Sequence, residues 1–514
     1  MNPERETKTE VTASKILLYL MLAFGFFLLV RSLFAPLFYP YWSEFQFIFF
    51  GILLYATFFF ILFLVSKRLS ARGRKILLFI LTIIVSAGLL YTVFKVQVTP
   101  VVDLSYIIDQ STYMLENDIT TFPEKFQEYY SFYTNNIPIA ILIYHVFRFG
   151  RMIFGPACNY SIIGGLFNFI MIILSIFCLF RLSDIVTDNE KSSFFLKIIL
   201  LVNPGWLAFV SYYYTDTISL PFALGGALLL FRANNLSENY KKFICLFISG
   251  MLFALGFKIR PTSIIILIAA IVFYLYKKNF KNLVMIVISF FLSFLVVFAL
   301  YSQAYNSLVK YDTYETGIPT THFLMMGSHG HGDFNPNDEA YTKSLKTHEE
   351  KVKGTLEKYR DNLINNGVIG NISLFFIKEG HVFGEGTRAY HQYVLNAKED
   401  TIAHQILAGK WSGYFKGIMQ SYNIIWILLA IGGIWCGRKS ISDYQLILLI
   451  YWFGTMLFSV LWEAHPRHAF SYVPFLILLS APLMNVIALK WTENKHIIGN
   501  CDTCSESSQS RIKR

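Results

Sequence analysis

The sequence predicts an all-α polytopic membrane protein with about twelve transmembrane helices and a mixed, α-containing extracytoplasmic loop domain. Of the 514 residues, 55% are hydrophobic and only 15% are charged, whereas a soluble protein carries about 25% charged residues. The mean hydropathy is +0.48. Several apolar runs reach the length of about 20 residues that a spanning helix needs. These runs exclude a chain of several soluble domains, which the length alone would allow.

Twelve segments are sufficiently long and apolar to cross a membrane. Pro204 lies within the fifth segment and is expected to kink it. The seventh and eighth segments are short, and they meet at a tight turn that carries Lys258 and Arg260. The predicted spans are 16–38, 46–66, 76–94, 161–183, 194–214, 217–232, 243–257, 262–276, 283–303, 419–435, 443–462 and 469–489.

The basic residues orient these helices. The loop between the first two spans has no Lys or Arg, and the next loop has five. Because cytoplasmic loops carry an excess of Lys and Arg, we expect this second loop and both termini to be cytoplasmic. The first apolar run is too long for a cleaved signal peptide. The basic residues then expected on the cytoplasmic side are Lys67, Arg68, Arg72, Arg74, Lys75, Arg232, Lys241, Lys242, Lys277, Lys278, Lys281, Arg438 and Lys439.

This topology divides the chain into five parts. Residues 1–15 and 491–514 are expected to be cytoplasmic tails, 16–303 to hold spans one to nine, 304–418 to form an extracytoplasmic domain, and 419–490 to hold the last three spans.

Two polar segments fall on the outer side. The outer loop 95–160 contains the apolar stretch Ile137–Phe149, which is too short to span and is expected to form an interfacial or re-entrant helix. In the second segment, Thr347 and Glu350 have the spacing of a helix-capping box, and Gly367 is expected to end that helix.

Charge and cysteine content exclude other classes of protein. The net charge is +11, but the basic residues sit in short loops between apolar runs, so they orient helices and do not indicate nucleic-acid binding. The six cysteines form no disulfide framework. Cys501 and Cys504 make a single CxxC pair in the polar tail, which does not amount to a four-ligand zinc site.

Three acidic residues at the outer ends of spans are candidates for chemistry. Asp103 and Asp109 follow the third span within an otherwise apolar run, and Asp216 begins the sixth. A charge near membrane depth is costly, so such residues indicate function by default. The structural alternatives are an N-terminal cap or an interfacial carboxylate in water for the first two, and an N-cap for Asp216.

Basic residues on the outer face are unusual and are candidates for phosphate binding. They are Lys258 and Arg260 in the tight turn and Arg467 before the last span. Arginine binds phosphate oxygens through two parallel hydrogen bonds. Alternatively, these side chains only anchor helices at the interface.

A second kind of site is offered by a histidine-rich stretch of the outer domain, since His-x-His can hold a metal. The alternative is a polar, glycine-rich loop. The residues are His322, His329, His331 and Asp333.

In order and sidedness these motifs resemble the GT-C superfamily of membrane glycosyltransferases, in the branch of bacterial relatives of the protein-O-mannosyltransferases (glycosyltransferase family 39-like). The Pro-x-x-Asp that follows the family's first catalytic-side helix matches Pro100 to Asp103, although the second acid, Asp109, stands six residues further on. The Tyr-x-Asn-Asn before a juxtamembrane helix is similar to Tyr133 to Asn136. The similarity covers roughly residues 76–490.

Four further motifs follow in the family's order. Asn203-Pro204 with a tyrosine-rich stretch leads to Tyr214 and Asp216. The turn Lys258 to Pro261 matches a Lys-x-Arg-Pro motif. The stretch His465-Pro-Arg467-His468 takes the place of a basic-aromatic pair, with His468 replacing Tyr. The loop Gly384-Glu385-Gly386-Thr387 resembles a Gly-Asp-Gly-Thr motif of related Gram-positive proteins.

The resemblance implies an enzyme that moves a sugar from a polyprenyl-phosphate carrier to an extracytoplasmic acceptor by an inverting displacement, in the membrane and without nucleic acid. Asp103 and Asp109 would be catalytic, and Lys258, Arg260 and Arg467 would bind the donor phosphate. No metal would be needed, since fixed cations can replace it. Composition suggests a bacterial plasma membrane and a cell-wall or surface glycan as acceptor. The substrate-binding candidates are Tyr133, Asn136, Tyr214, Asp216, His465 and Glu385.

Two alternatives remain open. A polysaccharide polymerase or ligase would use a glycan linked to a lipid diphosphate, and a lipid or glycan transporter would make no covalent change. Transporters tend to carry internal repeats and ionisable residues near the membrane midplane. Here the charges cluster at the outer ends of the spans and a long outer segment is present, which favours an enzyme.

Overall fold

The structure, a computed structural model, describes residues 8–38, 44–96, 100–394 and 400–489. Within these ranges no residue lies in a strand, so the predicted all-helical fold is confirmed. The insert, residues 309–411 between two long spans, consists of short helices, one long helix and turns in the part that is described. The paired cysteines Cys501 and Cys504 lie outside the described residues.

Eleven helices within the described ranges are long and apolar enough to cross a membrane. Ten coincide with predicted spans, and the chain is therefore an integral membrane protein of many spans. The ten are α1 (Lys8–Leu33), α3 (Phe45–Arg68), α4 (Ala71–Lys95), α8 (Tyr160–Val186), α12 (Leu220–Asn234) with the preceding turn α11 (Thr215–Ile218), α13 (Asn239–Ile259), α15 (Phe280–Leu308), α21 (Ser412–Gly437), α22 (Asp443–Leu461) and α23 (Ala469–Ile477), which continues through η5 (Leu478–Ser480) to Leu489.

The two remaining predicted spans are not continuous helices of spanning length, although the eighth agrees with its predicted short extent. The fifth is divided into α9 (Glu190–Leu201) and α10 (Gly205–Phe209). The break lies at Asn203-Pro204, where the Asn203 side chain accepts a hydrogen bond from the Gly205 backbone N–H at 2.9 Å, so the predicted proline kink is confirmed. The eighth is α14 (Ile265–Tyr276), preceded by the turn η3 (Pro261–Ile264).

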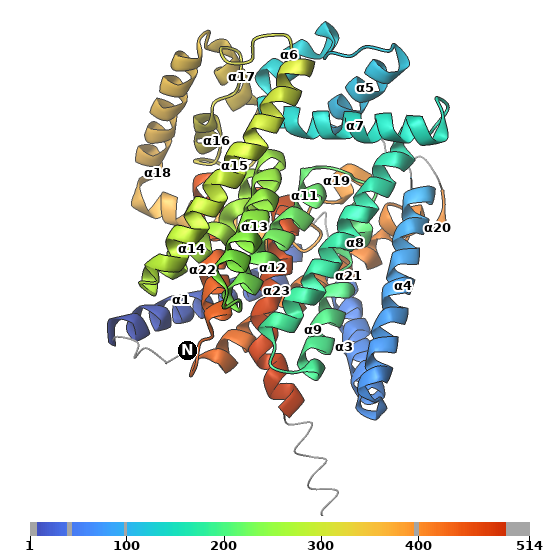
Figure 1. Ribbon diagram of the computed structural model, residues 1–514, viewed down its shortest axis with the longest axis vertical. Helices are drawn as coiled ribbons and strands as arrows, with labels where there is room; N and C mark the ends of the chain where they lie inside the picture. Colours follow the sequence, from blue (N-terminus) through green and yellow to red (C-terminus); the bar gives the residue numbers. More distant parts are fainter. Residues whose placement is uncertain (1–7, 39–43, 97–99, 395–399, 490–514) are drawn as a thin grey trace, which may run out of the picture.

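The eleventh apolar helix contains α7 (Ile137–Phe154), which was predicted to be interfacial. By length and composition alone, Thr134–Phe154 could cross a membrane. Figure 1 shows α7 lying crosswise at one end of the bundle, whereas α4 and α8 run lengthwise. This orientation agrees with the interfacial interpretation. We call this end, which also carries the insert, the insert end of the bundle.

Burial divides the spans into a central and a peripheral set. Most of α12, α21 and the α23 segment is buried inside the protein, whereas α3, α4 and α15 are largely exposed. Small residues permit the closest contacts in the centre. A Cβ atom on Gly433 of α21 would lie 2.0 Å from the Leu479 carbonyl oxygen, so these two helices touch through their backbones.

Two predicted boundaries differ from the structure. The tail predicted for residues 1–15 is helical from Lys8 onward, as part of α1, and the first span ends at Leu33 before the short α2 (Ala35–Phe38). The predicted outer domain 304–418 begins later and ends earlier, because α15 continues to Leu308 and α21 starts at Ser412. Spanning helices extend past their apolar core because the backbone hydrogen bonds continue into polar sequence.

The insert contains the predicted capped helix. This helix, α18 (His348–Gly384), starts with a capping box in which the Thr347 hydroxyl accepts from the Glu350 N–H, and the Glu350 carboxylate accepts from the Thr347 N–H. Gly367 interrupts it with φ 61° and ψ −175°, a region that favours glycine, and the helix then resumes to Gly384. The other insert helices are α16 (Thr320–Met326), α17 (Pro336–Ser344), α19 (His391–Val394) and α20 (Ile402–Leu407).

Candidate active site

Asp103 is the first residue of α5 (Asp103–Glu116), at the insert end of the bundle. The residue before it, Val102, has φ 51° and ψ −131°, a conformation that costs a β-branched residue about 1–3 kcal/mol. Strained backbone of this kind concentrates at functional sites. The turn at Val102 starts α5 at Asp103 and so places the carboxylate at the N-terminal end of the helix, whose dipole favours a negative charge.

Asp103 belongs to a closed ring of four polar side chains. The Tyr129 hydroxyl of α6 (Gln127–Phe132) donates to Asp103 Oδ1 at 2.6 Å. The Tyr214 hydroxyl lies 3.0 Å from Asp103 Oδ2 and 2.8 Å from Asn136 Oδ1. Asn136 Nδ2 closes the ring by donating to the Tyr129 hydroxyl at 2.7 Å. Asn136 and Tyr214 are buried, so the ring holds the carboxylate in one orientation.

A second cluster brings together two predicted phosphate-binding residues. Arg260 Nη1 lies 2.5 Å from Asp216 Oδ1, and Arg467 Nε lies 2.9 Å from Asp216 Oδ2. Asp216 is only 1% exposed, so its charge is neutralised by the arginines and not by water. Two guanidinium groups on one carboxylate leave a net positive charge, which suits an anionic ligand.

Aromatic side chains connect the two clusters. The Arg467 guanidinium carbon lies 5.0 Å from the centre of the Tyr214 ring, within the range of a cation–π contact. Arg467 Nη1 also donates to the hydroxyls of Tyr393 at 3.0 Å and Tyr212 at 3.3 Å. Tyr393 comes from α19 of the insert. Residues from the α10–α11 connection, the start of the last span and the insert therefore meet at Arg467.

A third group of titratable residues adjoins Arg467 through His465. The His381 Nε2 atom is 3.3 Å from Asp333 Oδ2, and the rings of His381 and His465 are 6.5 Å apart. Burial raises the pKa of the Glu463 carboxyl to about 7, and the charge of Asp333 raises it as well, while Arg467 lowers it. Burial lowers the pKa of His465 to about 4. The predicted residue His465 thus lies beside the arginine cluster. Its Nδ1 atom accepts a hydrogen bond from the backbone N–H of Arg467 at 3.1 Å.

An aromatic surface adjoins Asp103. The rings of Tyr106 and Tyr129 stack at 3.9 Å with an angle of 5° between their planes, and the Tyr133 ring lies 5.0 Å from that of Tyr129. Tyr106 is 43% exposed, so one face of this stack is open. The pKa of predicted residue Tyr133 is raised by burial and by a hydrogen bond to Glu339, which ties this surface to α17.

Three predicted residues lie outside these clusters. Asp109 is exposed; six residues after Asp103, it sits roughly 120° away around α5, given about 100° per helical residue. The Lys258 ammonium lies 3.2 Å from the centre of the Phe298 ring and 4.3 Å from that of Tyr301, both on α15. It therefore packs on the periphery.

The third is Glu385, which is buried in a turn of the insert. Its Oε1 accepts from the Thr387 N–H at 2.7 Å and its Oε2 from the Ala389 N–H at 3.1 Å. Arg388 and Ala389 have φ angles of 57° and 54°, and Arg388 Nη1 donates to the Glu385 carbonyl at 2.7 Å. The structure thus assigns both carboxylate oxygens to holding this turn, which leads to Tyr393.

Two of the histidines predicted as metal ligands bond other side chains of the insert. His322 Nδ1 lies 2.7 Å from the Thr342 hydroxyl, and His329 Nε2 lies 2.6 Å from Asp338 Oδ2. Among the residues that the structure describes, no group of three or more His, Cys, Asp or Glu side chains has an arrangement suited to a metal ion.

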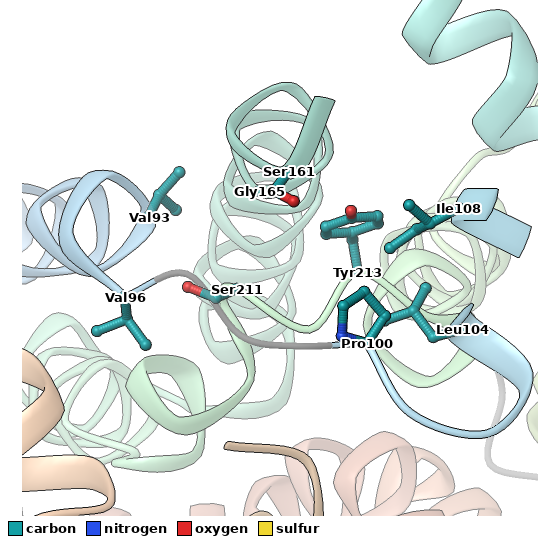
Figure 2. Close-up of a pocket in the computed structure, with 9 residues that line it drawn as sticks. All are labelled: Val93, Val96, Pro100, Leu104, Ile108, Ser161, Gly165, Ser211 and Tyr213. Carbon is teal, nitrogen blue, oxygen red and sulfur yellow. The ribbon is translucent and has the colours of Figure 1, made fainter. Parts of the chain in front are cut away.

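An apolar pocket borders the turn that precedes Asp103. Figure 2 shows Pro100, Leu104 and Ile108 on one side of it, with Val93 and Val96 on the other. The Ser211 side chain lies between them, and its hydroxyl has no hydrogen-bond partner among the described residues. The full lining is Val93, Val96, Pro100, Leu104, Ile108, Ser161, Gly165, Ser211 and Tyr213.

A family model described as conserved hypothetical integral membrane protein matches residues 14–487. The chain belongs to this family. The match includes every residue of the three clusters, so the site is part of the family's common region. No curated protein matches the sequence.

Solved structures of an archaeal oligosaccharyltransferase and of ArnT are similar at low identity. The apo oligosaccharyltransferase of Archaeoglobus fulgidus is 13% identical with a TM-score of 0.46, covering 82% of this chain and 52% of its own. The same enzyme, AglB, with an inhibitory peptide and a dolichol-phosphate, is 12% identical with a TM-score of 0.44, covering 83% and 52%. ArnT from Cupriavidus metallidurans, bound to undecaprenyl phosphate, is 11% identical with a TM-score of 0.35, covering 81% and 78%. The chain spans about half the length of the archaeal enzyme.

Sequence reasoning missed Tyr129, Tyr393 and Glu463. Tyr129 lies in a tyrosine-rich stretch, four residues before Tyr133. Its position one helical turn before Tyr133 is all that distinguishes it from the neighbouring tyrosines. Tyr393 follows the turn held by Glu385, and nothing in its neighbourhood marks it. Glu463 did carry a signal, because it is an acidic residue directly after an apolar span and only four residues before Arg467.

Proposed function

We propose that this protein is a membrane glycosyltransferase that moves a sugar from a polyprenyl-phosphate carrier to an acceptor on the non-cytoplasmic side. The observation that carries the proposal is the position of Tyr214. Its hydroxyl bonds Asp103 and its ring packs against Arg467, so a candidate base and a cationic anion site share one side chain. A single displacement at a sugar phosphate needs both groups within the length of one substrate.

The proton balance of the Asp103 ring supports its role as a base. Four hydrogen-bonding contacts close the ring. With Asp103 ionised, each tyrosine supplies one proton and the Asn136 amide supplies one N–H, so one contact lacks a proton. A proton added to Asp103 would donate to Tyr214, which would then donate to Asn136 and complete all four. The ring is thus arranged to accept one proton.

The arginine cluster suits the leaving group. As the bond between the anomeric carbon and the phosphate oxygen breaks, that oxygen takes the electron pair and gains negative charge. The net positive charge of Arg260 and Arg467 around Asp216 would stabilise it in a site with little water. The acceptor hydroxyl forms the new bond from the opposite face, which inverts the anomeric carbon, and its proton passes to Asp103.

The surroundings of Asp103 fit a sugar acceptor. The open face of the Tyr106–Tyr129 stack, beside Asp103, suits a sugar acceptor such as a cell-wall or surface glycan, because aromatic rings pack against apolar faces. The active site would face the outside of a bacterial plasma membrane, with both termini in the cytoplasm.

The second candidate is a polymerase or ligase that uses a lipid diphosphate. The pair of arginines favours it, because one arginine would be enough to bind a monophosphate. A transporter is less favoured, because the buried Asp216–Arg260 pair lies close to the Asp103 ring and its aromatic surface, and transport does not require such an arrangement.

The test is transfer of label from a radiolabelled polyprenyl-monophosphate sugar in membranes that contain the full-length protein. We expect label to reach a polymeric acceptor with the wild type and with Glu116→Gln, an exposed change on the same helix, but not with Asp103→Asn. Asp109→Asn, on another face of α5, should retain transfer. Transfer by Asp103→Asn at the wild-type rate would remove Asp103 from the reaction. Transfer only from a diphosphate-linked glycan would establish the polymerase or ligase.

A further inference from the structure

The second half of α18 begins with an uncharged segment inside a charged helix. Residues 346–361 carry many Lys, Arg, Glu and Asp side chains, whereas residues 362–377 carry none, and charge resumes at Lys378 and Glu379. We call residues 362–377 the α18 elbow, because Gly367 breaks the helix within it. α18 is not among the helices of the described ranges that could span a membrane. The elbow therefore needs another explanation for its composition.

The elbow exposes an apolar stripe. Val368 and Ile369 are 77% and 85% exposed, among the highest values for large apolar residues in the protein. Val368, Ile372 and Phe376 follow one another at intervals of four, so they lie on one face of the helix. Burying such a face in an apolar medium is favourable by about 25 cal/mol per Å². The stripe consists of Ile364, Val368, Ile369, Ile372 and Phe376.

The elbow lies against α1, which is long and apolar enough to cross a membrane. The Phe376 ring is 4.9 Å from that of Phe27, and the Phe375 ring is 6.3 Å from that of Phe24, both in the apolar part of α1. In Figure 1, α18 runs down the side of the bundle and its lower part lies below the level of the crosswise α7. The stripe is thus continuous with apolar surface that α1 presents to lipid.

Asparagine side chains around the kink bond within the protein, and one of them satisfies a backbone carbonyl beside the break. Asn371 Nδ2 donates to the Leu363 carbonyl at 2.9 Å, and Asn366 Nδ2 donates to the Ser328 carbonyl at 3.0 Å and to Asn371 Oδ1 at 3.1 Å. Asn362 Nδ2 donates to the Ser328 hydroxyl at 2.8 Å. In water, solvent can bond the backbone groups that a helix break leaves free. In a bilayer, each backbone group without a hydrogen-bond partner costs several kcal/mol.

We propose that the α18 elbow dips into the lipid bilayer beside α1 and immerses its apolar stripe there. The occupant of this face is the membrane itself. The insert would then be fixed against the bundle at two places, by the elbow in the lipid and by Lys378, whose ammonium donates to the carbonyls of Gly327, Val460 and Trp462 at 2.6–2.8 Å. This inference is independent of the proposed glycosyltransferase activity.

The experiment places a polarity-sensitive fluorophore on single cysteines in the full-length protein, with the native cysteines replaced by serine. The labelled variants are Ile369→Cys in the elbow, Glu357→Cys on the charged half of α18, and Phe291→Cys on the exposed face of the spanning helix α15. Each is reconstituted in phosphatidylcholine–phosphatidylglycerol vesicles and quenched either by spin-labelled lipid or by aqueous iodide.

We expect the label at 369 to behave like that at 291, with loss of fluorescence to the lipid quencher and little to iodide, and the label at 357 to behave in the opposite way. Iodide quenching at 369 equal to that at 357 would overturn the proposal. Protection at 369 from both quenchers would also overturn it, since the face would then be covered by protein, such as a second copy. Size-exclusion profiles matching the unlabelled protein show that each variant is folded.

Discussion

The guanidinium carbon of Arg467 lies 5.0 Å from the centre of the Tyr214 ring, while the hydroxyl of the same tyrosine contacts Asp103 at 3.0 Å. Through its two ends, Tyr214 joins two clusters that come from opposite ends of the sequence. The position of one charged group therefore depends on that of the other. Because the hydroxyl and the ring of Tyr214 make different contacts, substitutions can test the role of each separately.

Tyr214→Phe removes the hydroxyl and keeps the ring. We expect the rate of sugar transfer to fall about thirtyfold, because the substitution removes two hydrogen-bonding contacts of the Asp103 ring, and each bond is worth roughly 1 kcal/mol. The KM for the donor should change little, since the contact with Arg467 remains. Steady-state kinetics with the labelled donor measures both. A raised KM with an unchanged rate would place the hydroxyl on the donor and not on the base.

Asp216→Asn removes the counter-charge from the buried Arg260 and from the partly buried Arg467. We expect it to destabilise the folded protein by about 3–5 kcal/mol, because breaking a buried ion pair leaves charges without compensation. The matched control is Asp184→Asn, whose partner Lys197 lies at 2.5 Å but whose side chain is 42% exposed; exposed pairs contribute about 0–1 kcal/mol. Thermal unfolding in detergent measures both. Equal shifts in the two variants would mean that the arginines do not depend on Asp216.

Glu463 should make stability depend on pH. Burial raises its pKa from 4.5 to about 7, so between these values the folded state binds a proton that the unfolded chain releases. The contribution is fully present below pH 4.5 and is lost as the pH rises through 7, by at most about 3 kcal/mol. The difference in melting temperature between wild type and Glu463→Gln, measured from pH 4.5 to 8, isolates this group from the nearby histidines. A difference that stays constant across the range would show that the carboxyl titrates normally.

Two helical glycines should respond in opposite ways to alanine. At Gly433 a Cβ atom would lie 2.0 Å from the Leu479 carbonyl oxygen, so α21 must move away from the last span, at a cost of about 3 kcal/mol. At Gly88 in α4 no atom lies within 4 Å of the added Cβ, so Gly88→Ala should stabilise the helix by about 0.5–1 kcal/mol. Melting temperatures of the two variants check the pair. A neutral Gly433→Ala would mean that this helix contact is looser than described.

The sequence predicted most of the helices and the kinds of residue at the site. Long apolar runs, Pro204 and the Thr347 capping box act over one to a few helical turns, so they can be recognised without tertiary structure. Asp103, Asn136, Tyr214, Asp216, Arg260 and Arg467 were all singled out as candidates, and the structure brings these six together. Whether they perform the proposed reaction stays a prediction.

The sequence did not distinguish these residues from Asp109, Lys258 and Glu385. All three have the same chemical character as their neighbours in the motifs. Asp109 points elsewhere because of the helical period, and Lys258 packs against rings of α15 that lie some forty residues away in sequence. Glu385 is used by its own turn. Which of several similar residues joins the site depends on where each side chain points. That direction is fixed only when the helices pack together.

The sequence alone determined that the protein lies in a membrane, where most spans begin and end, and which charges stand at their ends, because hydrophobic length and helix signals are local. Only the tertiary structure decided that Tyr214 joins Asp103 to Arg467, that Asp216 pairs with two arginines, and that the α18 elbow lies against α1. Most of these relationships join segments more than a hundred residues apart in the sequence. They exist because burying a charged or polar group requires a partner, and the partner is supplied by whichever helix packs nearby.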